Sequence, residues 1–123
     1  MFDASAVIAL LRDEAGAERL AGSLRGNAIS AVNLAELVAH AVRSGTPTEE
    51  IRADFARLDL AVHSFDEDAA VATGDLAAAT RRLGLSLGDR ACLALAKKLG
   101  ATAVTADRAW AKLDLGIPVE IFR

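Results

Sequence analysis

Short apolar runs alternate with longer helical patterns along the chain, and this alternation constrains the fold more than any other feature of the sequence. The segments between the runs carry apolar residues three and four positions apart, as helices do. Parallel strands need such helical crossovers between them. We therefore predict an α/β domain whose central sheet has roughly four to five short, mostly parallel strands. The expected strands are residues 1–3, 28–30, 60–63, 103–105 and 119–122.

Helix start and stop signals place the helices between these strands. Ser30 and Ser86 precede helical patterns as N-cap residues. Capping-box patterns open two further helices, one in Thr46-Pro47-Thr48-Glu49 and one in Ser64-Phe65-Asp66-Glu67. The expected helices are residues 5–11, 14–24, 31–43, 47–58, 65–83, 87–99 and 106–113.

The composition describes one ordered domain over residues 1–123. Apolar residues make up 53% of the chain and charged residues 25%, which is typical of a folded protein and not of a disordered one. A chain of this length buries roughly two thirds of its unfolded surface in a single core. The net charge of -3 gives no general attraction for nucleic acids. Any contact with RNA would therefore depend on local patches of arginine and lysine.

The single cysteine and the apolar segments bear on the compartment. Cys92 excludes an intrachain disulfide, fits a reducing cytosol and is most simply a small core residue. No secretory signal is visible, because Asp3 interrupts the start of the chain and Arg12-Asp13-Glu14 closes the apolar run that follows. No stretch approaches the length of a membrane span. We expect a cytoplasmic protein with no membrane partner.

Two aspartates lie at the ends of predicted strands. Asp3 ends the first apolar run, and Asp107 comes two residues after Thr105. In open parallel sheets ligands bind at the carboxyl edge of the strands, so we expect both acids to lie at that edge. Each also has a structural interpretation, Asp3 as the N-cap of the following helix and Asp107 as a turn or first-turn residue.

A third acid, Asp89, lies in the first turn of the predicted helix 87–99. Helical periodicity puts Asp89, beside Cys92, at the margin of the apolar face. The expected centre of that face consists of Gly88, Ala91, Leu95 and Leu99. In the structural interpretation, Asp89 satisfies free amides three residues after Ser86 and interacts favourably with the helix dipole.

A polar strip runs along the predicted helix 31–43. The strip consists of Asn33, Glu36, His40 and Arg43, and the broad apolar face beside it of Ala31, Leu34, Ala35, Val38 and Val42. A solvated polar face is the ordinary interpretation of such a strip. Glu36 and His40 are four residues apart and could share a metal ion. Without the second histidine of an HExxH pattern, this spacing is weak evidence for zinc.

Four segments together resemble a known family. They are MFDASAVIALL, ISAVNLAEL, GLSLGDRACLALAKKLG and AVTADRAW, in this order. They resemble the PIN-domain ribonucleases, specifically the VapC toxins of bacterial toxin-antitoxin pairs, over essentially the whole chain. The resemblance implies a three-layer PIN-like domain with a site of four carboxylates. Its members would be Asp3, Glu36, Asp89 and Asp107. One departure is the short first strand, in which only Met1 and Phe2 precede Asp3.

A cluster of four carboxylates with no lysine among them implies a cation. The charges would otherwise repel one another and raise the pKa of each group. Hard oxygen ligands select Mg²⁺, with Mn²⁺ as a substitute, over zinc. Our hypothesis is that Asp3 and Asp89 hold the main ion, while Glu36 and Asp107 complete its shell, support a second ion or orient the attacking water. Candidate hydrogen-bond donors to these ligands are Ser5, Asn33 and Thr105.

The resemblance also implies partners. The substrate would be structured cellular RNA, often transfer RNA, and Arg90 and Arg108 directly follow two of the acids as candidate contacts. Solvated surface charge is the alternative interpretation of either arginine. Such toxins usually form homodimers and are inhibited by a cognate antitoxin. The resemblance implies contact with DNA only through that antitoxin. The apolar faces of 14–24 and 47–58 are candidate docking surfaces, or equally core.

Two other functions compete with this one. A receiver-like signalling module would need an acidic neighbour for Asp3 and a lysine directly after a late strand, whereas Lys112 falls within a predicted helix. A catalytically silent PIN-like module that binds a partner or a nucleic acid is the stronger alternative. A divalent-ion titration distinguishes it, because a silent module predicts no thermal stabilisation by Mg²⁺.

Overall fold

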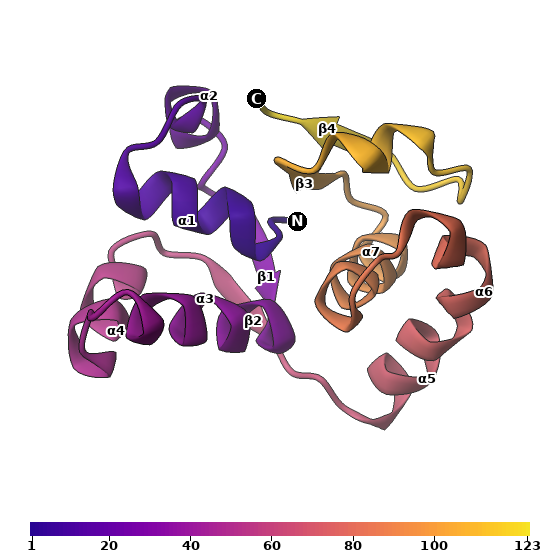
Figure 1. Ribbon diagram of the computed structural model, residues 1–123, viewed down its shortest axis with the longest axis horizontal. Helices are drawn as coiled ribbons and strands as arrows, with labels where there is room; N and C mark the ends of the chain where they lie inside the picture. Colours follow the sequence, from indigo (N-terminus) through magenta and orange to yellow (C-terminus); the bar gives the residue numbers. More distant parts are fainter.

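A parallel sheet lies at the centre of the computed structural model, which describes residues 1–123 (Figure 1). Strand β1 (Ala28–Ser30) pairs with β2 (Ala61–His63), and β3 (Ala103–Thr105) pairs with β4 (Val119–Ile121), both in parallel. Phe2 joins the two pairs through parallel bridges to β1 and β3. The order across the sheet is therefore β2, β1, Phe2, β3, β4. The predicted parallel sheet is confirmed, and the expected first strand is reduced to a single paired residue.

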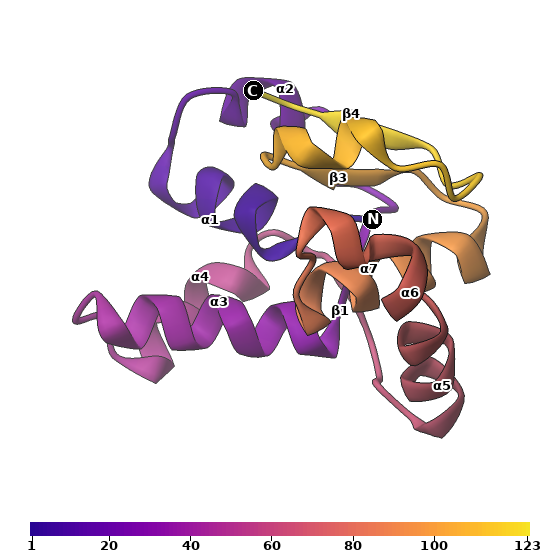
Figure 2. The ribbon, with the colours of Figure 1, turned by 45° about the vertical axis from the view of Figure 1, so that its right-hand side comes forward.

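Helices cover both faces of this sheet (Figures 1 and 2). One layer consists of α1 (Ala4–Arg12), α2 (Ala17–Ala21), α3 (Ala31–Arg43) and α4 (Thr48–Ala56), and its core includes Phe2. The other layer holds a second core with Cys92 and Trp110, and its elements are α5 (Glu67–Asp75), α6 (Ala77–Thr80), the 3₁₀ helix η1 (Arg81–Leu83) and α7 (Leu87–Leu99). With the sheet between the two helical layers, the predicted three-layer architecture is confirmed.

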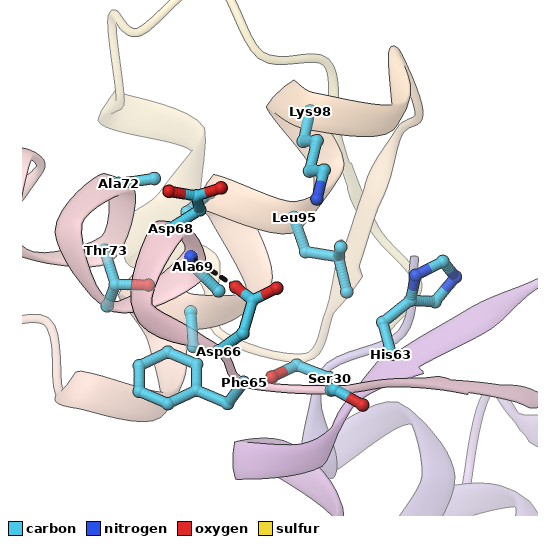
Figure 3. A pocket seen from close by; sticks show the side chains of 13 residues that line it. Ser30, His63, Phe65, Asp66, Asp68, Ala69, Ala72, Thr73, Leu95 and Lys98 are labelled. Carbon is cyan, nitrogen blue, oxygen red and sulfur yellow. Dashed lines mark hydrogen bonds between the residues drawn. The ribbon is translucent and has the colours of Figure 1, made fainter.

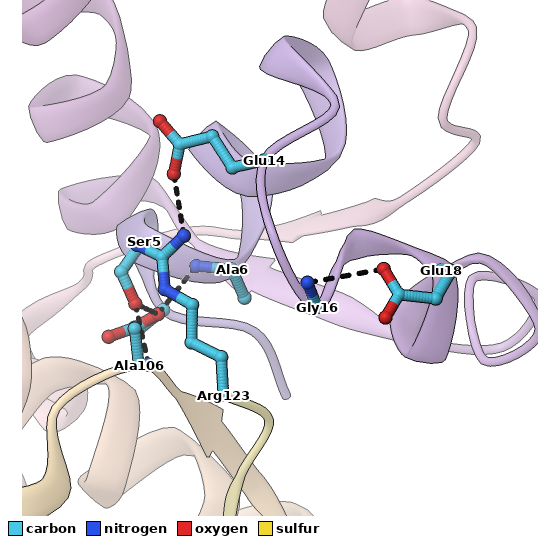
Figure 4. A network of polar contacts seen from close by, with 8 residues as sticks. Ser5, Ala6, Glu14, Gly16, Glu18, Ala106 and Arg123 are labelled. Atoms are coloured by element: carbon cyan, nitrogen blue, oxygen red, sulfur yellow. Dashed lines mark hydrogen bonds and ion pairs between the residues drawn. The ribbon is translucent and has the colours of Figure 1, made fainter.

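The chain ends beside the first layer. The 3₁₀ helix η2 (Arg108–Lys112) connects β3 to β4 and replaces the expected helix 106–113. After β4, the Arg123 guanidinium forms an ion pair with Glu14 in the loop between α1 and α2, at 2.7 Å (Figure 4). No helix of the structure combines the length and the hydropathy that crossing a membrane would require.

The N-cap predictions are confirmed at two helices and wrong at two others. Ser30 and Ser86 accept backbone hydrogen bonds at the starts of α3 and α7. The Thr46 capping box does not form, because α4 begins only at Thr48 and Pro47 occupies the N-cap position. Ser64 does not cap α5 either. Asp66 lies closer to the helix, and its carboxylate accepts from the Ala69 amide at 2.8 Å.

Two predicted helices are shorter than expected. The helix predicted over 14–24 extends only over Ala17–Ala21. The helix predicted over 65–83 is divided into α5, α6 and η1. Gly74, a poor helix former, precedes the break, and Leu76 at the break turns its side chain into the second core.

Helix α3 is turned about its axis relative to the prediction, although Leu34 and Val38 of the predicted apolar face still pack against the core that includes Phe2. Its buried residues are Asn33, Leu37 and Ala41, so part of the polar strip points inward and not to solvent. Residues of the broad apolar face are instead partly or fully accessible, and Val42 is 50% exposed. Hydrophobicity alone therefore placed the centre of the buried face of α3 at the wrong residues. As a consequence Glu36 is directed toward the interior, and an apolar stripe lies open on the surface.

Candidate active site

Acidic residues gather at the carboxyl edge of the sheet. Asp3 directly follows Phe2, and its amide donates to the Val104 carbonyl of β3 at 3.1 Å. Asp107 lies just beyond the end of β3, while Glu36 lies in the second turn of α3, which begins directly after β1. Asp89 lies in the first turn of α7. The topology thus brings the four predicted acids to one edge, as expected of ligand sites in parallel sheets.

The Asp3 carboxylate is the most tightly held of the four. It is only 6% exposed. One oxygen, Oδ1, accepts from the Ser5 hydroxyl at 2.7 Å and from the Ala6 amide at 2.9 Å, and Oδ2 accepts from the Thr105 hydroxyl at 2.5 Å. The bond from Ala6 makes Asp3 the N-cap of α1. The interpretation of Asp3 as the N-cap of the following helix is therefore correct. The cap uses Oδ1, and Oδ2 lies next to Thr105 at the end of β3.

Two hydroxyl groups connect Asp3 to the loop that carries Asp107. The Ser5 hydroxyl accepts from the Ala106 amide at 2.9 Å, a contact that Figure 4 shows beside the start of α1. The Thr105 hydroxyl accepts from the Asp107 amide at 3.0 Å. Asp107 itself is exposed and caps η2 through the Ala109 amide, so its structural interpretation is also correct. Ser5 and Thr105 thus orient Asp3 and fix the backbone next to Asp107.

Asn33 links Glu36 to the start of α7. This asparagine is 1% exposed, and its Nδ2 donates both to Glu36 Oε2 at 3.0 Å and to the Gly88 carbonyl at 3.1 Å. Glu36 is half-buried as a result. The contact brings the N-terminal turns of α3 and α7 together. Sequence reasoning did not include Gly88 in the site, although a glycine in the first turn of a helix is a signal that some other constraint overrides helix propensity.

Asp89 combines a structural role with a place in the acidic group. Its Oδ2 accepts from the Ser86 amide at 2.8 Å, and its own amide donates to the Ser86 hydroxyl at 3.1 Å. The capping interpretation is therefore correct. Asp89 is partly exposed beside the fully buried Cys92 and Leu93, in keeping with the predicted position at the margin of the buried face. Leu99, predicted at the centre of that face, is instead 44% exposed.

The electrostatics couple three of the acids. Burial raises the pKa of Asp3 above its ordinary value, its three hydrogen bonds oppose this, and the charge of Asp89 adds to it. Burial also raises the pKa of Glu36, against the hydrogen bond from Asn33, and the charges of Asp89 and Asp3 contribute further. Burial and the same three charges raise the pKa of the Cys92 thiol, which lies in the core beneath them.

This group of acids carries uncompensated negative charge. The ion pairs of the structure involve Glu14, Glu49 and Asp54, and none of the four site acids takes part in one. Glu36 Oε1, Asp89 Oδ1 and Asp107 Oδ2 accept no hydrogen bond from the protein. An all-oxygen, anionic donor set with open oxygens fits a hard divalent cation such as Mg²⁺. As the side chains stand, however, no three of the His, Cys, Asp and Glu residues are arranged to hold a metal ion.

The two arginines proposed for RNA contact differ in their surroundings. Arg90 donates through Nη1 to the Thr73 carbonyl at 3.3 Å and so ties α7 to α5. Arg108 is exposed, directly follows Asp107, and forms neither an ion pair nor a side-chain hydrogen bond. The guanidinium of Arg108 thus has no protein partner, whereas one nitrogen of the partly exposed Arg90 is bonded to α5.

A separate cavity of about 370 Å³ lies between α5 and α7, at the ends of β1 and β2 (Figure 3). Ala91, Ala94 and Leu95 line it, on a different side of α7 from Asp89 and Cys92. None of the four site acids reaches it. The cavity is therefore distinct from the acidic edge.

The raised pKa values predict how the stability of the metal-free protein depends on pH. A carboxyl group whose pKa is raised by folding costs no stability while it is protonated. As pH rises from its ordinary pKa to its pKa in the folded protein, the free energy of unfolding falls. Relative to Glu36→Gln, the wild type is expected to lose stability as pH rises above about 4.5, the ordinary value for Glu36. Thermal denaturation of both proteins at several pH values tests this. A difference in Tm that is independent of pH would contradict it.

Comparisons with known proteins agree with the fold. The family model of the PIN domain matches residues 1–115. A toxin-antitoxin complex from Klebsiella pneumoniae contains a chain with a TM-score of 0.71 and 23% identity, over 97% of this chain and 93% of that one. A chain of VapBC2 from Rickettsia felis, solved bound to a DNA fragment from its promoter, gives a TM-score of 0.73 and 20% identity. The match covers 98% of this chain and 96% of that one. No curated protein sequence matches the chain.

Proposed function

The chain belongs to the PIN-domain family, and on this premise we propose that it is a divalent-metal-dependent endoribonuclease that acts as the toxin of a toxin-antitoxin pair. The observation that carries the proposal is the group of Asp3, Glu36 and Asp89. Asp3 at the N-cap of α1, Glu36 in α3 and Asp89 in α7 lie at one sheet edge. The charge of Asp89 contributes to the raised pKa of both Asp3 and Glu36, and none of the three acids takes part in an ion pair. Such a group is costly unless a cation or a reaction uses it.

Mg²⁺, or Mn²⁺ in its place, is the proposed cofactor. Asp3, Glu36, Asp89 and Asp107 would hold one or two ions through carboxylate oxygens. A bound ion would promote ionisation of a water molecule and stabilise charge on the scissile phosphate. Ser5 and Thr105 hold the Asp3 carboxylate in place, and Asn33 holds that of Glu36. These donors keep each ligand oriented, as hydrogen-bond partners of metal ligands do.

The proposed substrate is structured cellular RNA, with transfer RNA as a candidate, which implies action in the cytoplasm. The net charge of -3 disfavours general nucleic-acid binding, so recognition would depend on local contacts such as Arg108. Two structural neighbours are described as a toxin-antitoxin complex and as VapBC2 bound to promoter DNA. By analogy we propose a cognate antitoxin as partner, and contact with DNA only through that antitoxin.

A homodimer is the proposed assembly, and the apolar stripe of α3 is its proposed interface. The stripe is a hollowed apolar surface that continues toward α4 through Ile51 and Phe55. Exposed contiguous apolar surface of this kind marks interaction sites. The residues of the stripe are Ala31, Leu34, Ala35, Val38, Ala39 and Val42.

Val42→Glu is expected to weaken self-association at least about tenfold, because it places a charge on apolar surface that the interface would desolvate. Val42 is 50% exposed in the single chain, so the fold should tolerate the change. Val71→Glu is the control, at a 62% exposed valine of α5 in the other helical layer. Sedimentation velocity over a concentration series measures both. Equal self-association of the two variants would place the interface elsewhere.

The catalytic proposal is tested with total cellular RNA and the purified chain. Discrete cleavage products with Mn²⁺ or Mg²⁺, lost on adding EDTA and regained on adding excess metal, are expected. Sequencing of the product ends would identify the target. If the folded, inhibitor-free protein leaves all RNA intact with either metal, the catalytic proposal fails.

The alternative is a catalytically silent PIN-like module that binds a partner or a nucleic acid. One observation favours it, namely that the acids do not form a preassembled metal cage. A silent module would neither cleave RNA nor gain thermal stability from Mg²⁺, whereas the catalytic proposal requires both.

A further inference from the structure

We infer that Gly88 is a positioning residue of the acidic site, because its missing side chain creates the space in which the Glu36 carboxylate lies. The expected effect on metal binding rests on the proposed function, whereas the contact between Gly88 and Glu36 is present in the protein without a metal ion. Gly88 is buried, and it directly precedes Asp89 in the first turn of α7. It is therefore the point at which Glu36 approaches the backbone that carries the neighbouring acid.

The group nearest to the open side of Gly88 is the Glu36 carboxylate. A Cβ atom built on Gly88 would overlap Glu36 Oε1, Oε2 and Cδ, all at distances that atoms do not adopt. The three nearest atoms to that position all belong to the Glu36 carboxylate. Any side chain at position 88 would therefore have to displace this carboxylate.

The backbone gives no other reason for a glycine at this position. Gly88 does not adopt the left-handed conformation that favours glycine, unlike Gly84 and Gly100 at either end of the same segment. Within a helix, glycine is less favourable than alanine. Gly74 in α5 is a matched case, because it is also helical but nothing lies within 4 Å of the position that a Cβ atom would occupy there. The approach of Glu36 is therefore what distinguishes Gly88.

Asn33 holds Glu36 in this space from the other side. Its Nδ2 bridges Glu36 Oε2 and the Gly88 carbonyl, so the carboxylate is fixed between the asparagine amide and the Cα atom of Gly88. The Asn33 Oδ1 is buried and has no hydrogen-bond partner. A buried acceptor without a partner is unfavourable. The favourable contribution of Asn33 therefore comes from the two hydrogen bonds that its Nδ2 donates. The contact with α7 thus determines where Glu36 lies relative to Asp89.

Gly88→Ala is expected to move the Glu36 carboxylate without unfolding the protein. Alanine improves the helix propensity of α7, so Tm should not fall by more than a few degrees. The affinity for Mn²⁺ measured without RNA should fall about 10- to 100-fold, the range found when the surroundings of a metal ligand are disturbed. Gly74→Ala should leave the affinity unchanged. A purely structural role for Gly88 would instead lower Tm and leave the Mn²⁺ affinity of the folded protein intact.

A shorter acid supplies the rescue. Glu36→Asp withdraws the carboxylate by one methylene group, so it should weaken Mn²⁺ binding alone but partly restore it in the Gly88→Ala background. Isothermal titration of the wild type, the two single variants and the double variant measures this coupling. Additive losses would overturn the inference, as would an unchanged affinity in Gly88→Ala.

A readout in the metal-free protein separates this inference from the proposed function. The side-chain amide resonances of Asn33 report its contact with Glu36 and Gly88. Gly88→Ala should shift them, and Gly74→Ala should not. If the wild type binds no Mn²⁺, the proposed function fails while this result still decides the inference. Unshifted Asn33 resonances in Gly88→Ala would overturn it.

Discussion

Asp3→Asn is expected to reduce metal-dependent RNA cleavage by at least about 100-fold while leaving the protein folded. Loss of a group that only supports a metal ligand typically costs 10- to 100-fold, so loss of a proposed ligand should cost at least the upper value. Asparagine caps helices as well as aspartate does, so α1 should keep its N-cap. The rate of cleavage of one mapped RNA site measures the effect.

The same substitution should separate stability from metal binding. Burial raises the pKa of Asp3, so its ionised form destabilises the fold at neutral pH and the penalty vanishes only when the group is protonated. Neutral asparagine removes that penalty but replaces the oxygen that accepts from Thr105 with an amide nitrogen, which cannot accept. The two effects oppose each other, so the Tm of the metal-free variant should stay within a few degrees of the wild type. The increase in Tm that Mn²⁺ gives the wild type should disappear. A variant that keeps the full Mn²⁺ response would exclude Asp3 as a ligand.

Thr105→Val should produce the largest loss of stability among substitutions that keep the shape of the side chain. The Thr105 hydroxyl is fully buried, donates to Asp3 and accepts from the Asp107 amide. Valine leaves both partners unsatisfied, which lowers the free energy of unfolding by about 1–3 kcal/mol. Affinity for Mn²⁺ should fall as well, since Asp3 loses a donor that orients it. Chemical denaturation and titration with Mn²⁺ measure the two effects.

Thr73→Val is the matched control for this prediction. Thr73 is 1% exposed, but its hydroxyl has no hydrogen-bond partner. Valine removes a buried, unsatisfied group there, so stability should be unchanged or higher. Equal losses in the two variants would mean that the hydroxyl of Thr105 has no special role.

Local signals predicted much of this structure. Ser30 and Ser86 cap α3 and α7 because short polar side chains satisfy amides within the same turn, which requires no knowledge of the rest of the fold. The expected strands 28–30 and 103–105 form β1 and β3 as predicted. The placement of Asp3 and Asp107 at one edge followed from the rule that parallel strands end together.

Tertiary contacts account for what the sequence did not reveal. Periodicity alone made Asn33 and Glu36 a solvated strip, but Asn33 is buried because it bonds to α7, which is distant in sequence. The bond from the Arg90 guanidinium to the Thr73 carbonyl of α5 likewise joins residues 17 positions apart, and Arg90 stays a predicted RNA contact. A glycine in the first turn of α7 indicated some constraint at position 88, but its nature depends on where Glu36 lies in space. Each depends on a long-range pairing that no local pattern encodes.

Cleavage rates of the wild type, Asp89→Asn and Asp66→Asn with Mn²⁺ test most directly whether RNA cleavage depends on the acids at the sheet edge. Asp66 is a cap of α5 outside the acidic group, so its variant makes the same chemical change away from the site. We predict discrete cuts by the wild type and Asp66→Asn, and loss of those cuts in folded Asp89→Asn. Equal cleavage by all three proteins, or cleavage that persists in EDTA, would contradict the account.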